Sequence, residues 1–473
     1  MTLAAGPDEA PVVVWFRRDL RVDDHPALAA AVASGRPVIP LAVLDPALLA
    51  AATTGPRRRT AYLAALAALD GDLADRGGRL VVRSGDPADV LPGLAAETGA
   101  GAVLATRDPA PAGVRRDAAV SATGIRLHLL PGTLAVEPEA IGPSRVFGAF
   151  HRRWLAAPRR SPIAAPATVR VPDGVAGEVL AEIAPVGRAD AERRLAAFLR
   201  ERLARYDVDR HRLDLDGTSG LSTALHFGTI SVARVVAAVD AAVTSGAPAA
   251  AAAAFLRQLA WRDWAMHRSW FGLDVAGAGT GLPWDAPDPG GELQWRQDAG
   301  GLEAWRSGDT GYPTVDAAMR ELAATGRIHN RARMIAASFL VKDLLLDWRV
   351  GARHFLRELV DGDVANNTLG WRWTAGLGPD AAPFIRVFNP VVQGRRFDPE
   401  GDWVRCWIPE LRDLPSRVVH EPWAAPGGPP AGYPAPIVDH AAARQRAMAA
   451  FASRVRQAAG GSRRARSDGE GRA

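Results

Sequence analysis

The sequence is poor in cysteine and lysine, and it has no long hydrophobic run. Cys406 is the single cysteine of the 473 residues, which excludes a disulfide framework and a cysteine-clustered zinc or iron–sulfur site. Apolar runs such as 249–256, with 8 residues, are far short of the about 20 that a membrane-spanning helix needs. The N-terminal segment MTLAAGPDEA has neither the basic region nor the apolar core of a secretory signal. These absences predict a cytoplasmic protein in a reducing compartment, without a membrane segment or a metal centre.

Arginine and tryptophan are the unusual features of what is present. Lys342 is the single lysine, so 56 of the 57 basic residues are arginine, and the formal net charge is +5. This excess permits nucleic-acid binding without requiring it. There are 14 tryptophans against 4 tyrosines, and all except Trp15 and Trp154 lie beyond residue 260. No HExxH zinc motif and no Gly-x-Ser-x-Gly elbow occurs, which argues against a metalloprotease or a serine hydrolase.

The first 135 residues predict an α/β domain. Ala- and Leu-rich stretches of helical length, such as 59–76, alternate with short runs of β-branched residues. We expect strands at 12–16, 38–44, 80–83, 102–105 and 126–130. Five strands with helix-length connections indicate a doubly wound, Rossmann-like parallel sheet. Such a sheet binds ligands at the carboxyl ends of its strands, yet RRDLRVDDHPAL, rather than a glycine-rich phosphate loop, follows Phe16.

The rest of the chain predicts an all-helical domain that follows a connector. Residues 136–190 become rich in proline, glycine and alanine and are interpreted as the interdomain connector. Residues 191–458 form the predicted helical domain, and the tail 459–473 is predicted to be disordered. Helical periodicity marks 190–206, 231–243, 249–270, 313–325, 329–348, 351–360 and 440–458, with an irregular, proline-rich stretch at 376–440.

Two short motifs are candidates for ligand binding. Thr218–Ser222 (TSGLS) offers three hydroxyls and backbone amides just before a helix expected near Ser231. Such a turn suits phosphate oxygens without a lysine, and the alternative is an ordinary helix cap. Residues 361–363, Asp-Gly-Asp, place two carboxylates where they can accept hydrogen bonds from a heterocycle or an arginine. The alternative there is a capped turn or part of a calcium loop, although Arg372 stands where such a loop needs its glutamate.

The helix expected at 329–348 carries a mixed face near its start. Asn330, Arg333 and Met334 are three and four residues apart and therefore share one side of that helix. Such a face is usually core packing beside a solvated arginine, so these residues alone do not indicate a function.

Together and in this order, the motifs resemble the photolyase/cryptochrome family, closest to its bacterial class I cyclobutane pyrimidine dimer DNA photolyases. The opening VVWFRRDLRVDDHPAL is similar to the family's N-terminal signature, as are TSGLSTALHFGTIS, LAWRDW and DGDVANNTLGWRW to later ones. The same holds for TGYPTVDAAMRELAATGRIHNRARMIAASFLVKDLLLDWRVG and for DAAPFIRVFNPVVQG, PELRDLP, HEPW and YPAPIVDH. The resemblance covers almost the whole chain and is weak only at 107–190 and after 445.

The resemblance implies an α/β antenna domain and an all-helical domain that binds FAD. It implies light-driven repair of cyclobutane pyrimidine dimers in DNA, in which excited reduced FAD passes an electron to a lesion flipped out of the duplex. The expected partner is damaged DNA, with no membrane, and the protein is expected to be a monomer. The alternatives are a blue-light-sensing cryptochrome and a (6-4) photolyase. The short tail, 459–473, favours the enzyme over the sensor.

Site residues follow from the resemblance by motif position. The residues expected to bind FAD are Tyr206, Thr218, Ser219, Gly220, Leu221, Ser222, Phe255, Arg333, Asp361, Gly362, Asp363 and Asn367. The residues expected to act in catalysis are Asn367, near flavin N5, and an electron relay from flavin to solvent, Trp371, Trp348 and Trp295. The residues expected to face DNA or the lesion are Arg210, Gln258, Trp261, Arg262, Asn330, Arg331, Met334, Trp373 and Arg386. The alternative for the relay tryptophans is aromatic core, and both roles are compatible.

Several positions depart from the family's motifs or differ between its dimer-repairing and (6-4) members. Thr223 stands where the family has proline after the phosphate turn, which we expect to be tolerated. Gln258 replaces the glutamate of bacterial dimer photolyases, and glutamine there is familiar from (6-4) photolyases and animal cryptochromes. Met334 stands where (6-4) photolyases use histidine, and because a thioether cannot donate a proton, dimer repair is expected. Residues 107–109 replace the family's folate signature, so the antenna is expected to be a deazaflavin rather than methenyltetrahydrofolate, or absent.

Overall fold

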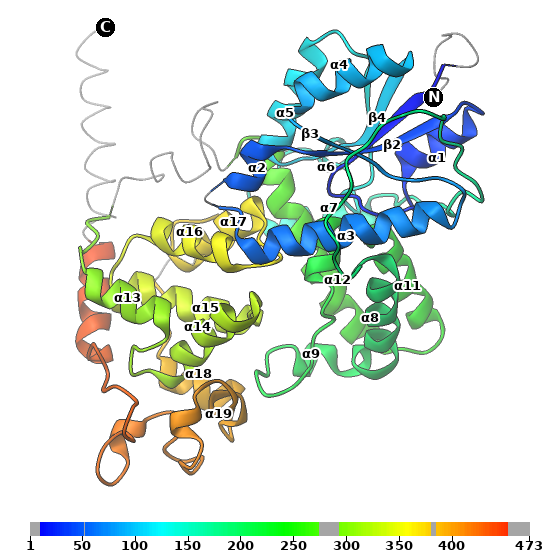
Figure 1. Ribbon diagram of the computed structural model, residues 1–473. Helices are drawn as coiled ribbons and strands as arrows, with labels where there is room; N and C mark the ends of the chain where they lie inside the picture. Colours follow the sequence, from blue (N-terminus) through cyan, green and yellow to red (C-terminus); the bar gives the residue numbers. More distant parts are fainter. Residues whose placement is uncertain (1–9, 52, 274–292, 380–384, 453–473) are drawn as a thin grey trace, which may run out of the picture. The chain divides into compact units, whose positions relative to one another are not determined.

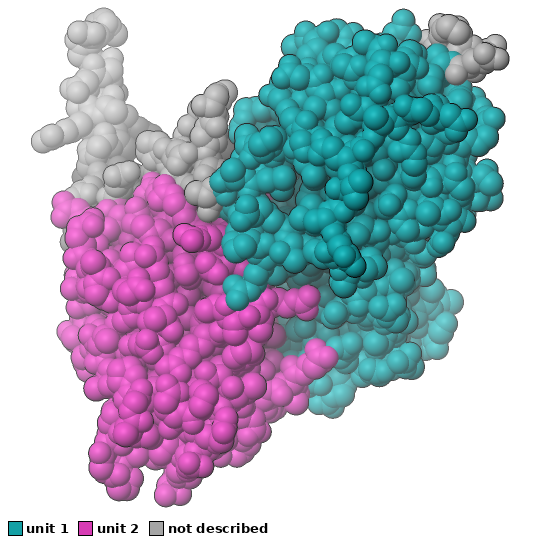
Figure 2. Space-filling model, in the orientation of Figure 1, with its two compact units in different colours: residues 1–210, 217–273, 360–363 teal, residues 211–216, 274–359, 364–473 magenta. Residues whose placement is uncertain are grey.

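A computed structural model describes residues 10–51, 53–273, 293–379 and 385–452. The chain forms two compact units, which Figure 2 colours separately. Unit 1 contains residues 1–210, 217–273 and 360–363, and unit 2 contains residues 211–216, 274–359 and 364–473. The predicted boundaries at 135, 190 and 458 follow the type of secondary structure rather than compactness, so they remain predictions. The predicted tail, 459–473, lies outside the described residues.

The N-terminal part of unit 1 is a five-stranded parallel sheet (Figure 1). Its strands are β1 (Val12–Phe16), β2 (Val38–Leu44), β3 (Val81–Ser84), β4 (Ala102–Thr106) and β5 (Leu127–Leu130). The order β3-β2-β1-β4-β5 reverses direction at β1, where β1 pairs with both β2 and β4. The predicted doubly wound sheet is therefore confirmed, with every strand within one residue or two of its expected bounds.

Helices cover both faces of this sheet, which explains why its strands read as continuous apolar runs. On one face α1 (Pro26–Ala33) and α3 (Pro56–Ala74) pack through Leu28, Leu66 and Leu69. On the other face α4 (Pro87–Thr98) and α5 (Pro111–Ala122) pack through Leu91 and Val120. The short α2 (Pro46–Ala50) follows β2 and contributes no buried residue.

The predicted connector is partly helical. It contains α6 (Pro138–Ile141), α7 (Phe147–Ala156) and the first residues of α8 (Arg188–Glu201), and its longest stretch without helix or strand is 157–187. This irregular part still contributes to the core, because Val169 packs in the α1/α3 cluster and Val175 in the α4/α5 cluster. The connector therefore stabilises both faces of the sheet.

The remaining helices confirm a mostly helical second half (Figure 1). In unit 1 they are α8 (Arg188–Glu201), α9 (Tyr206–Asp209), α10 (Ser222–Phe227), α11 (Val232–Thr244) and α12 (Ala249–Trp270). In unit 2 they are α13 (Ala299–Ser307), α14 (Pro313–Thr325), α15 (Asn330–Ser338), α16 (Trp348–Glu358), α17 (Val364–Thr374), α18 (Pro390–Phe397), α19 (Asp402–Trp407) and a helical stretch over 440–452. Residues 453–458 of the last predicted helix lie outside the described residues.

Three predicted segments differ from the structure. The helix expected at 190–206 ends at Glu201, and a 3-10 turn (Leu203–Arg205) precedes α9. The helix expected at 329–348 leaves α-helical geometry after Ser338, continues as a π-helical turn (Phe339–Asp343) and stops before Leu345, whose φ is +55°. The stretch expected to be irregular, 376–440, contains α18, α19 and two 3-10 turns. The side chain of Asn389 caps α18 just before a proline, a start signal that the sequence interpretation missed.

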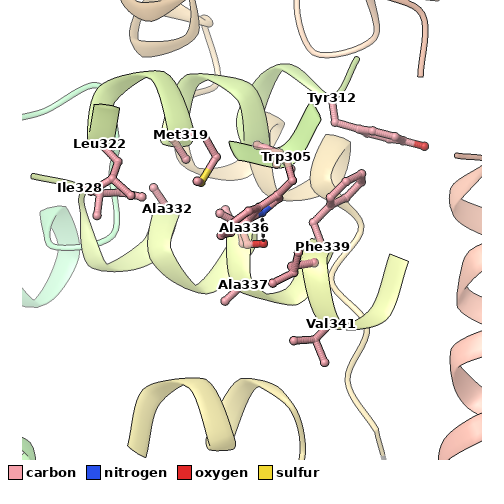
Figure 3. Close-up of a cluster of buried hydrophobic side chains, with 14 of the residues drawn as sticks. Trp305, Tyr312, Met319, Leu322, Ile328, Ala332, Ala336, Ala337, Phe339 and Val341 are labelled. Atoms are coloured by element: carbon pink, nitrogen blue, oxygen red, sulfur yellow. Dashed lines mark hydrogen bonds between the residues drawn. The ribbon is translucent and has the colours of Figure 1, made fainter. Parts of the chain in front are cut away.

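The core of unit 2 forms where α13, α14 and α15 meet (Figure 3). Trp305 is fully buried there, and its indole Nε1 donates a hydrogen bond to the carbonyl oxygen of Ala336 at 2.9 Å. Met319 and Leu322 of α14 belong to the same buried cluster, as does Phe339 at the start of the π-helical turn. The tryptophan therefore both fills the core and satisfies a backbone carbonyl in the middle of α15.

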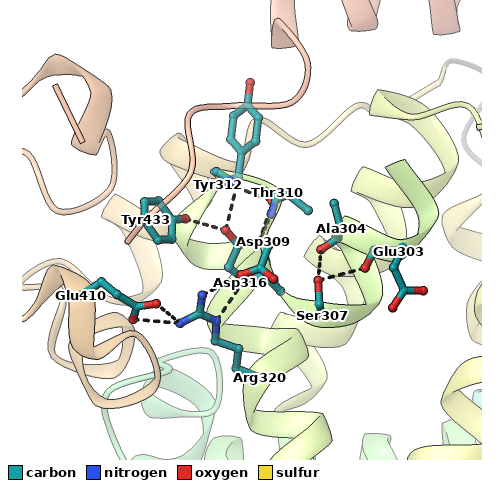
Figure 4. Close-up of polar contacts among 12 residues, drawn as sticks. Glu303, Ala304, Ser307, Asp309, Thr310, Tyr312, Asp316, Arg320, Glu410 and Tyr433 are labelled. Carbon is teal, nitrogen blue, oxygen red and sulfur yellow. Dashed lines mark hydrogen bonds and ion pairs between the residues drawn. The ribbon is translucent and has the colours of Figure 1, made fainter. Parts of the chain in front are cut away.

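A buried carboxylate organises the turn before α14 (Figure 4). Asp316 accepts hydrogen bonds from the amide of Thr310 at 2.8 Å, the amide of Gly311 at 3.0 Å and the phenol of Tyr433 at 2.5 Å. Burial outweighs these bonds and raises the pKa of Asp316 to about 6. The same turn is held to the 3-10 segment Pro409–Leu411 through Arg320, which donates to Glu410 at 2.9 Å.

Candidate functional site

The predicted phosphate turn of unit 1 has backbone groups available for a ligand. Gly220 adopts a φ of +63°, and Leu221 at the N-cap of α10 makes no capping hydrogen bond through its side chain. Ser219 Oγ accepts only a long bond of 3.4 Å from the Leu221 amide. The alternative of a cap for α11 fails, because Ser231 itself caps that helix by accepting from the Arg234 amide at 2.9 Å. The turn and the first turn of α10 therefore offer N–H and O–H donors.

Two aromatic residues predicted to contact the cofactor pack together in unit 1. The rings of Tyr206 and Phe255 lie 5.3 Å apart in an edge-to-face arrangement, and Phe198 touches both. Burial raises the pKa of Tyr206, and the Arg210 guanidinium lies 5.9 Å from its ring centroid. This cluster fixes the start of α9 against α12.

The Asp-Gly-Asp segment is anchored in unit 1 rather than in the helical unit that follows it in the chain. Val360, directly before it, packs in the α1/α3 cluster of the sheet. The Arg18 guanidinium donates to Asp363 Oδ2 at 2.9 Å and to the carbonyl oxygen of His226 at 3.1 Å. Although burial lowers the pKa of Arg18, attraction to Asp363 and Asp108 outweighs burial and raises it. The second carboxylate is thus held by a cation from the β1–α1 loop.

His226 and Arg58 complete this polar cluster. Burial and the neighbouring Arg18 and Arg58 hold the pKa of His226 well below its usual value, so the imidazole is neutral at pH 7. Burial lowers the pKa of Arg58 to about 10, against the attraction of Asp361 and Asp363. Sequence reasoning missed all three basic residues, although Arg18 lies inside the quoted opening motif. Two partly buried carboxylates need cationic partners, and this need was the signal in the sequence for Arg18 and Arg58.

A small basic pocket lies beside this cluster, within unit 1. Arg18, Arg21, His226 and Arg262 line it with the backbone of the α10–α11 turn. Arg262, predicted to face DNA, donates to the carbonyl of Thr133 at 3.1 Å and pairs with the adjacent Asp263 at 3.1 Å. Its predicted DNA contact remains a prediction.

Trp261 of α12, which is predicted to face the lesion, packs against other aromatic rings. Trp261 stacks on Phe147 of α7, with ring centroids 3.7 Å apart and an interplanar angle of 11°. Trp264 meets Trp261 edge-on at 5.2 Å. Gln258 lies one helical turn earlier on α12 and is half-buried. Phe147 was missed because the connector was not expected to contain a helix.

The three predicted relay tryptophans belong to unit 2 and differ in burial. Trp371 and Trp348 are 3% and 1% exposed, whereas Trp295 is half-buried. The Trp371 ring lies 5.0 Å from Phe355 and 6.2 Å from Trp305, both edge-on. Trp305 was not predicted as a neighbour of the relay. Trp371 therefore packs in an aromatic core, and its role in a relay remains a prediction.

The other predicted residues of unit 2 lie on α15, α17 and the segment before α18. Asn367 donates through Nδ2 to the carbonyl of Ala352 at 3.0 Å, which fixes its amide. Asn330 approaches the Met334 sulfur at 3.9 Å, which confirms that they share a helix face. Arg331 stacks on Phe397 at 4.5 Å and contacts His211 Nδ1 at 3.1 Å, so it is partly engaged within unit 2.

Three further predicted residues complete the set in unit 2. Arg333 donates to the carbonyl of Ile328 at 3.0 Å. Trp373 is half-buried on α17, and Arg386 is exposed. The predicted cofactor residues thus divide between the two units, with Arg333 and Asn367 in unit 2 and the others in unit 1.

Residues of unit 1 suit FAD. The turn Thr218–Ser222 supplies hydroxyls and uncapped amides for phosphate oxygens, and residues 361–363 supply carboxylates for the polar edges of a flavin or ribose. Among the described residues no group of three or more histidines, cysteines or carboxylates could hold a metal ion. No described helix is both long enough and apolar enough to cross a membrane.

Comparisons with known proteins identify the family of this chain. The family model for the FAD binding domain of DNA photolyase matches residues 255–453, and the DNA photolyase model matches residues 12–168. A deoxyribodipyrimidine photo-lyase of Streptomyces griseus is 43% identical over 92% of this chain and 97% of its own length. The enzyme of the same name from Escherichia coli is 34% identical over 93% of this chain and 98% of its own length.

Solved structures are similar over nearly the whole chain. A bacterial class III photolyase from Agrobacterium tumefaciens matches with a TM-score of 0.86 and 36% identity, covering 96% of this chain and 99% of its own. A Synechocystis cryptochrome matches with a TM-score of 0.85 and 28% identity, covering 93% and 99%. The two family models and these relatives show that this chain is an enzyme of the DNA photolyase family, with that family's FAD-binding domain.

Proposed function

We propose that the chain repairs cyclobutane pyrimidine dimers in DNA when it absorbs light. The observation that carries the proposal is the Asp361–Asp363 segment, in which Arg18 binds the Asp363 carboxylate and contacts a neutral His226, within the unit that also contains a turn of uncapped amides. Reduced FAD, when bound, supplies the excited-state electron that opens the cyclobutane ring. Such chemistry needs no nucleophile from the protein, in agreement with the absence of a hydrolase motif.

Residues of the chain bind and orient the cofactor in this proposal. Amides and hydroxyls of Thr218–Ser222 bind the phosphates, and Tyr206 and Phe255 exclude water beside them. Asp361 and Asp363 accept hydrogen bonds from the polar edges of the cofactor. The Ala352 carbonyl holds the Asn367 side chain by its Nδ2, which leaves Oδ1 to accept a further hydrogen bond.

The proposed lesion is the cyclobutane dimer because Met334 cannot donate a proton. A (6-4) product needs proton transfer, and the sulfur of Met334 offers none, while Asn330 covers it at 3.9 Å. Dimer opening needs only an electron and hydrogen bonds to the pyrimidine carbonyls. The neutral amide of Gln258 can donate such bonds, and Trp261, backed by Phe147, provides a stacking surface.

An illuminated assay on duplexes that each carry one defined lesion tests this choice. We expect the reduced protein to repair the dimer and to leave the (6-4) product intact. Repair of the (6-4) product alone would refute the proposed lesion. Repair of neither, with intact light-driven FAD reduction, would favour the second candidate, a blue-light sensor, which the similarity to a cryptochrome keeps open.

We propose that Trp371, Trp348 and Trp295 relay electrons to the flavin during photoreduction. Trp371 and Trp348 are buried and Trp295 is half-buried, as a relay that ends at the surface requires. Trp371→Phe should slow blue-light reduction of oxidised FAD strongly, while repair by chemically pre-reduced enzyme stays nearly intact. An unchanged photoreduction rate would remove the relay assignment.

A deazaflavin antenna, or none, is proposed in place of a folate. The segment that replaces the folate signature is engaged internally, because Arg107 pairs with Glu139 at 2.5 Å and Asp108 with Arg116 at 3.3 Å. The photolyase of Sulfolobus tokodaii, similar with a TM-score of 0.81, was described with two FAD molecules, which imply a novel light-harvesting cofactor in that protein. Absorption spectra before and after release of the chromophores distinguish deazaflavin, folate and FAD. We further propose that the protein is monomeric and cytoplasmic.

A further inference from the structure

The single lysine of the chain occupies an unusual position. Lys342 is 5% exposed and lies in the π-helical turn Phe339–Asp343, which continues α15. π-Helical turns are rare and concentrate at functional sites because they cost hydrogen-bond geometry. In a chain whose other basic residues are all arginine, a buried ammonium in such a turn indicates a specific need for a compact cation.

The Lys342 ammonium binds the backbone of a residue predicted to contact DNA. Its Nζ donates a hydrogen bond to the carbonyl oxygen of Arg386 and lies 6.0 Å from the centroid of the Phe388 ring. The Phe388 amide donates to Ser338 Oγ, at the end of α15, at 3.4 Å. Two contacts from one helix end thus fix the segment that presents Arg386, whose side chain is exposed.

The opposite side of the same turn is held by the C-terminal helical stretch 440–452. Asp343 contacts His440 Nδ1 at 2.5 Å, and Arg446 donates to the Asp343 carbonyl at 2.7 Å. The charged groups that act on the Lys342 ammonium are Asp343 and Arg386, whereas His440 and Arg446 bind Asp343. Burial lowers the pKa of Lys342 to about 8, with Asp343 raising it and Arg386 lowering it.

We propose that Lys342 is a positioning residue for DNA binding, which fixes the backbone of Arg386 so that its guanidinium meets a phosphate of the damaged strand. The compact ammonium suits this single carbonyl contact, whereas the larger, planar guanidinium of arginine suits two-pronged binding. This inference rests on the proposed repair function and extends it to the segment before α18.

The test compares DNA binding by Lys342→Met, Arg386→Ala and the double variant. Arg446→Met is the matched control, because it removes a cation from the other side of the same turn. Binding of a duplex with one cyclobutane dimer is measured against salt concentration. We expect Arg386→Ala and Lys342→Met each to reduce the slope of log affinity against log salt by about one contact and the affinity by about 3- to 10-fold. The double variant should bind no more weakly than Arg386→Ala, and the control should stay within about twofold of the wild type.

Two further readouts do not depend on repair. Amide hydrogen exchange of residues 385–389 in the free protein should accelerate in Lys342→Met but not in Arg446→Met. Wild-type affinity for the dimer duplex should weaken as pH rises through about 8, where Lys342 loses its proton, and Lys342→Met should lack this step. Both readouts separate positioning from a general loss of folding.

The outcomes distinguish failure of the Lys342 inference from failure of the proposed repair function. The inference would be overturned if Lys342→Met kept the wild-type salt dependence of affinity and the wild-type amide exchange of residues 385–389. It would also be overturned if the losses of affinity in Lys342→Met and Arg386→Ala added fully in the double variant. If the wild type shows no preference for dimer-containing DNA, the proposed repair function fails instead. The exchange measurement on the free protein then still decides whether Lys342 holds the segment.

Discussion

Close packing between α16 and Trp371 gives a sharp test of how the proposed relay is held. Gly351 on α16 faces the indole so closely that a Cβ there would lie 2.2 Å from Trp371 Cη2 and 2.5 Å from Leu340 Cδ2. Ordinary carbon–carbon contacts are about 3.5–4.0 Å, so in Gly351→Ala the new Cβ and the ring must move apart by about 1.3–1.8 Å. Gly370, next to Trp371 on α17, is exposed and has no atom within 4 Å of such a Cβ.

Both substitutions change the free energy of helix formation in the same way, but only Gly351→Ala also changes core packing. Each replaces a helical glycine by alanine, which stabilises the helix by about 0.5–1 kcal/mol. Gly351→Ala also overpacks the core, at a cost of about 1–3 kcal/mol. We therefore expect Gly370→Ala to be slightly more stable than the wild type. Gly351→Ala should be about 1–3 kcal/mol less stable than Gly370→Ala, because the shared helix term cancels.

Urea unfolding followed by far-UV circular dichroism measures the stability difference, with FAD present at equal saturation. Blue-light reduction of oxidised FAD provides the functional readout, with Trp371→Phe as the reference for a lost donor. Gly370→Ala should reduce at the wild-type rate, and Gly351→Ala should be slower because the displaced indole loses its packing on Phe355 at 5.0 Å. Equal stability and equal photoreduction in the two alanine variants would refute the packing described for Trp371.

Three other predictions concern binding and stability. Arg331→Ala should make the salt dependence of DNA affinity shallower by about one contact, and an unchanged slope would show that its contacts with Phe397 and His211 are its whole role. Asp316→Asn should destabilise the protein by about 2–4 kcal/mol, measured by urea unfolding. The reason is that the new NH2 group would face the Gly311 amide and the Tyr433 hydroxyl, which now donate hydrogen bonds to the carboxylate. The raised pKa of Asp316, about 6 against 3.8 unfolded, means that its burial penalty is absent below about pH 4 and complete above about pH 6. Stability should thus fall across this window as pH rises, and Asp316→Asn should remove that component.

The sequence determined the features that depend on local pattern. Runs of β-branched residues such as Val12–Phe16 predict strands because a two-sided sheet buries every residue, and the helix-length connections predict that the strands are parallel, as observed. Motif order identified the FAD-binding half of the chain, and helical spacing placed Asn330 and Met334 on one face. These inferences need only neighbours within one or two helical turns.

Tertiary structure decided which distant groups meet. No local pattern shows that Arg18 pairs with Asp363, 345 residues later, or that Val360 packs against the sheet. Phe147 backs Trp261 only because a helix forms inside a proline-rich connector. Likewise, the sequence shows Lys342 only as a basic residue in an expected helix. The structure shows that it lies in a π-helical turn and that its ammonium donates to the Arg386 carbonyl. Desolvation and long-range charge pairing set these contacts, and both depend on the folded surroundings rather than on residue spacing.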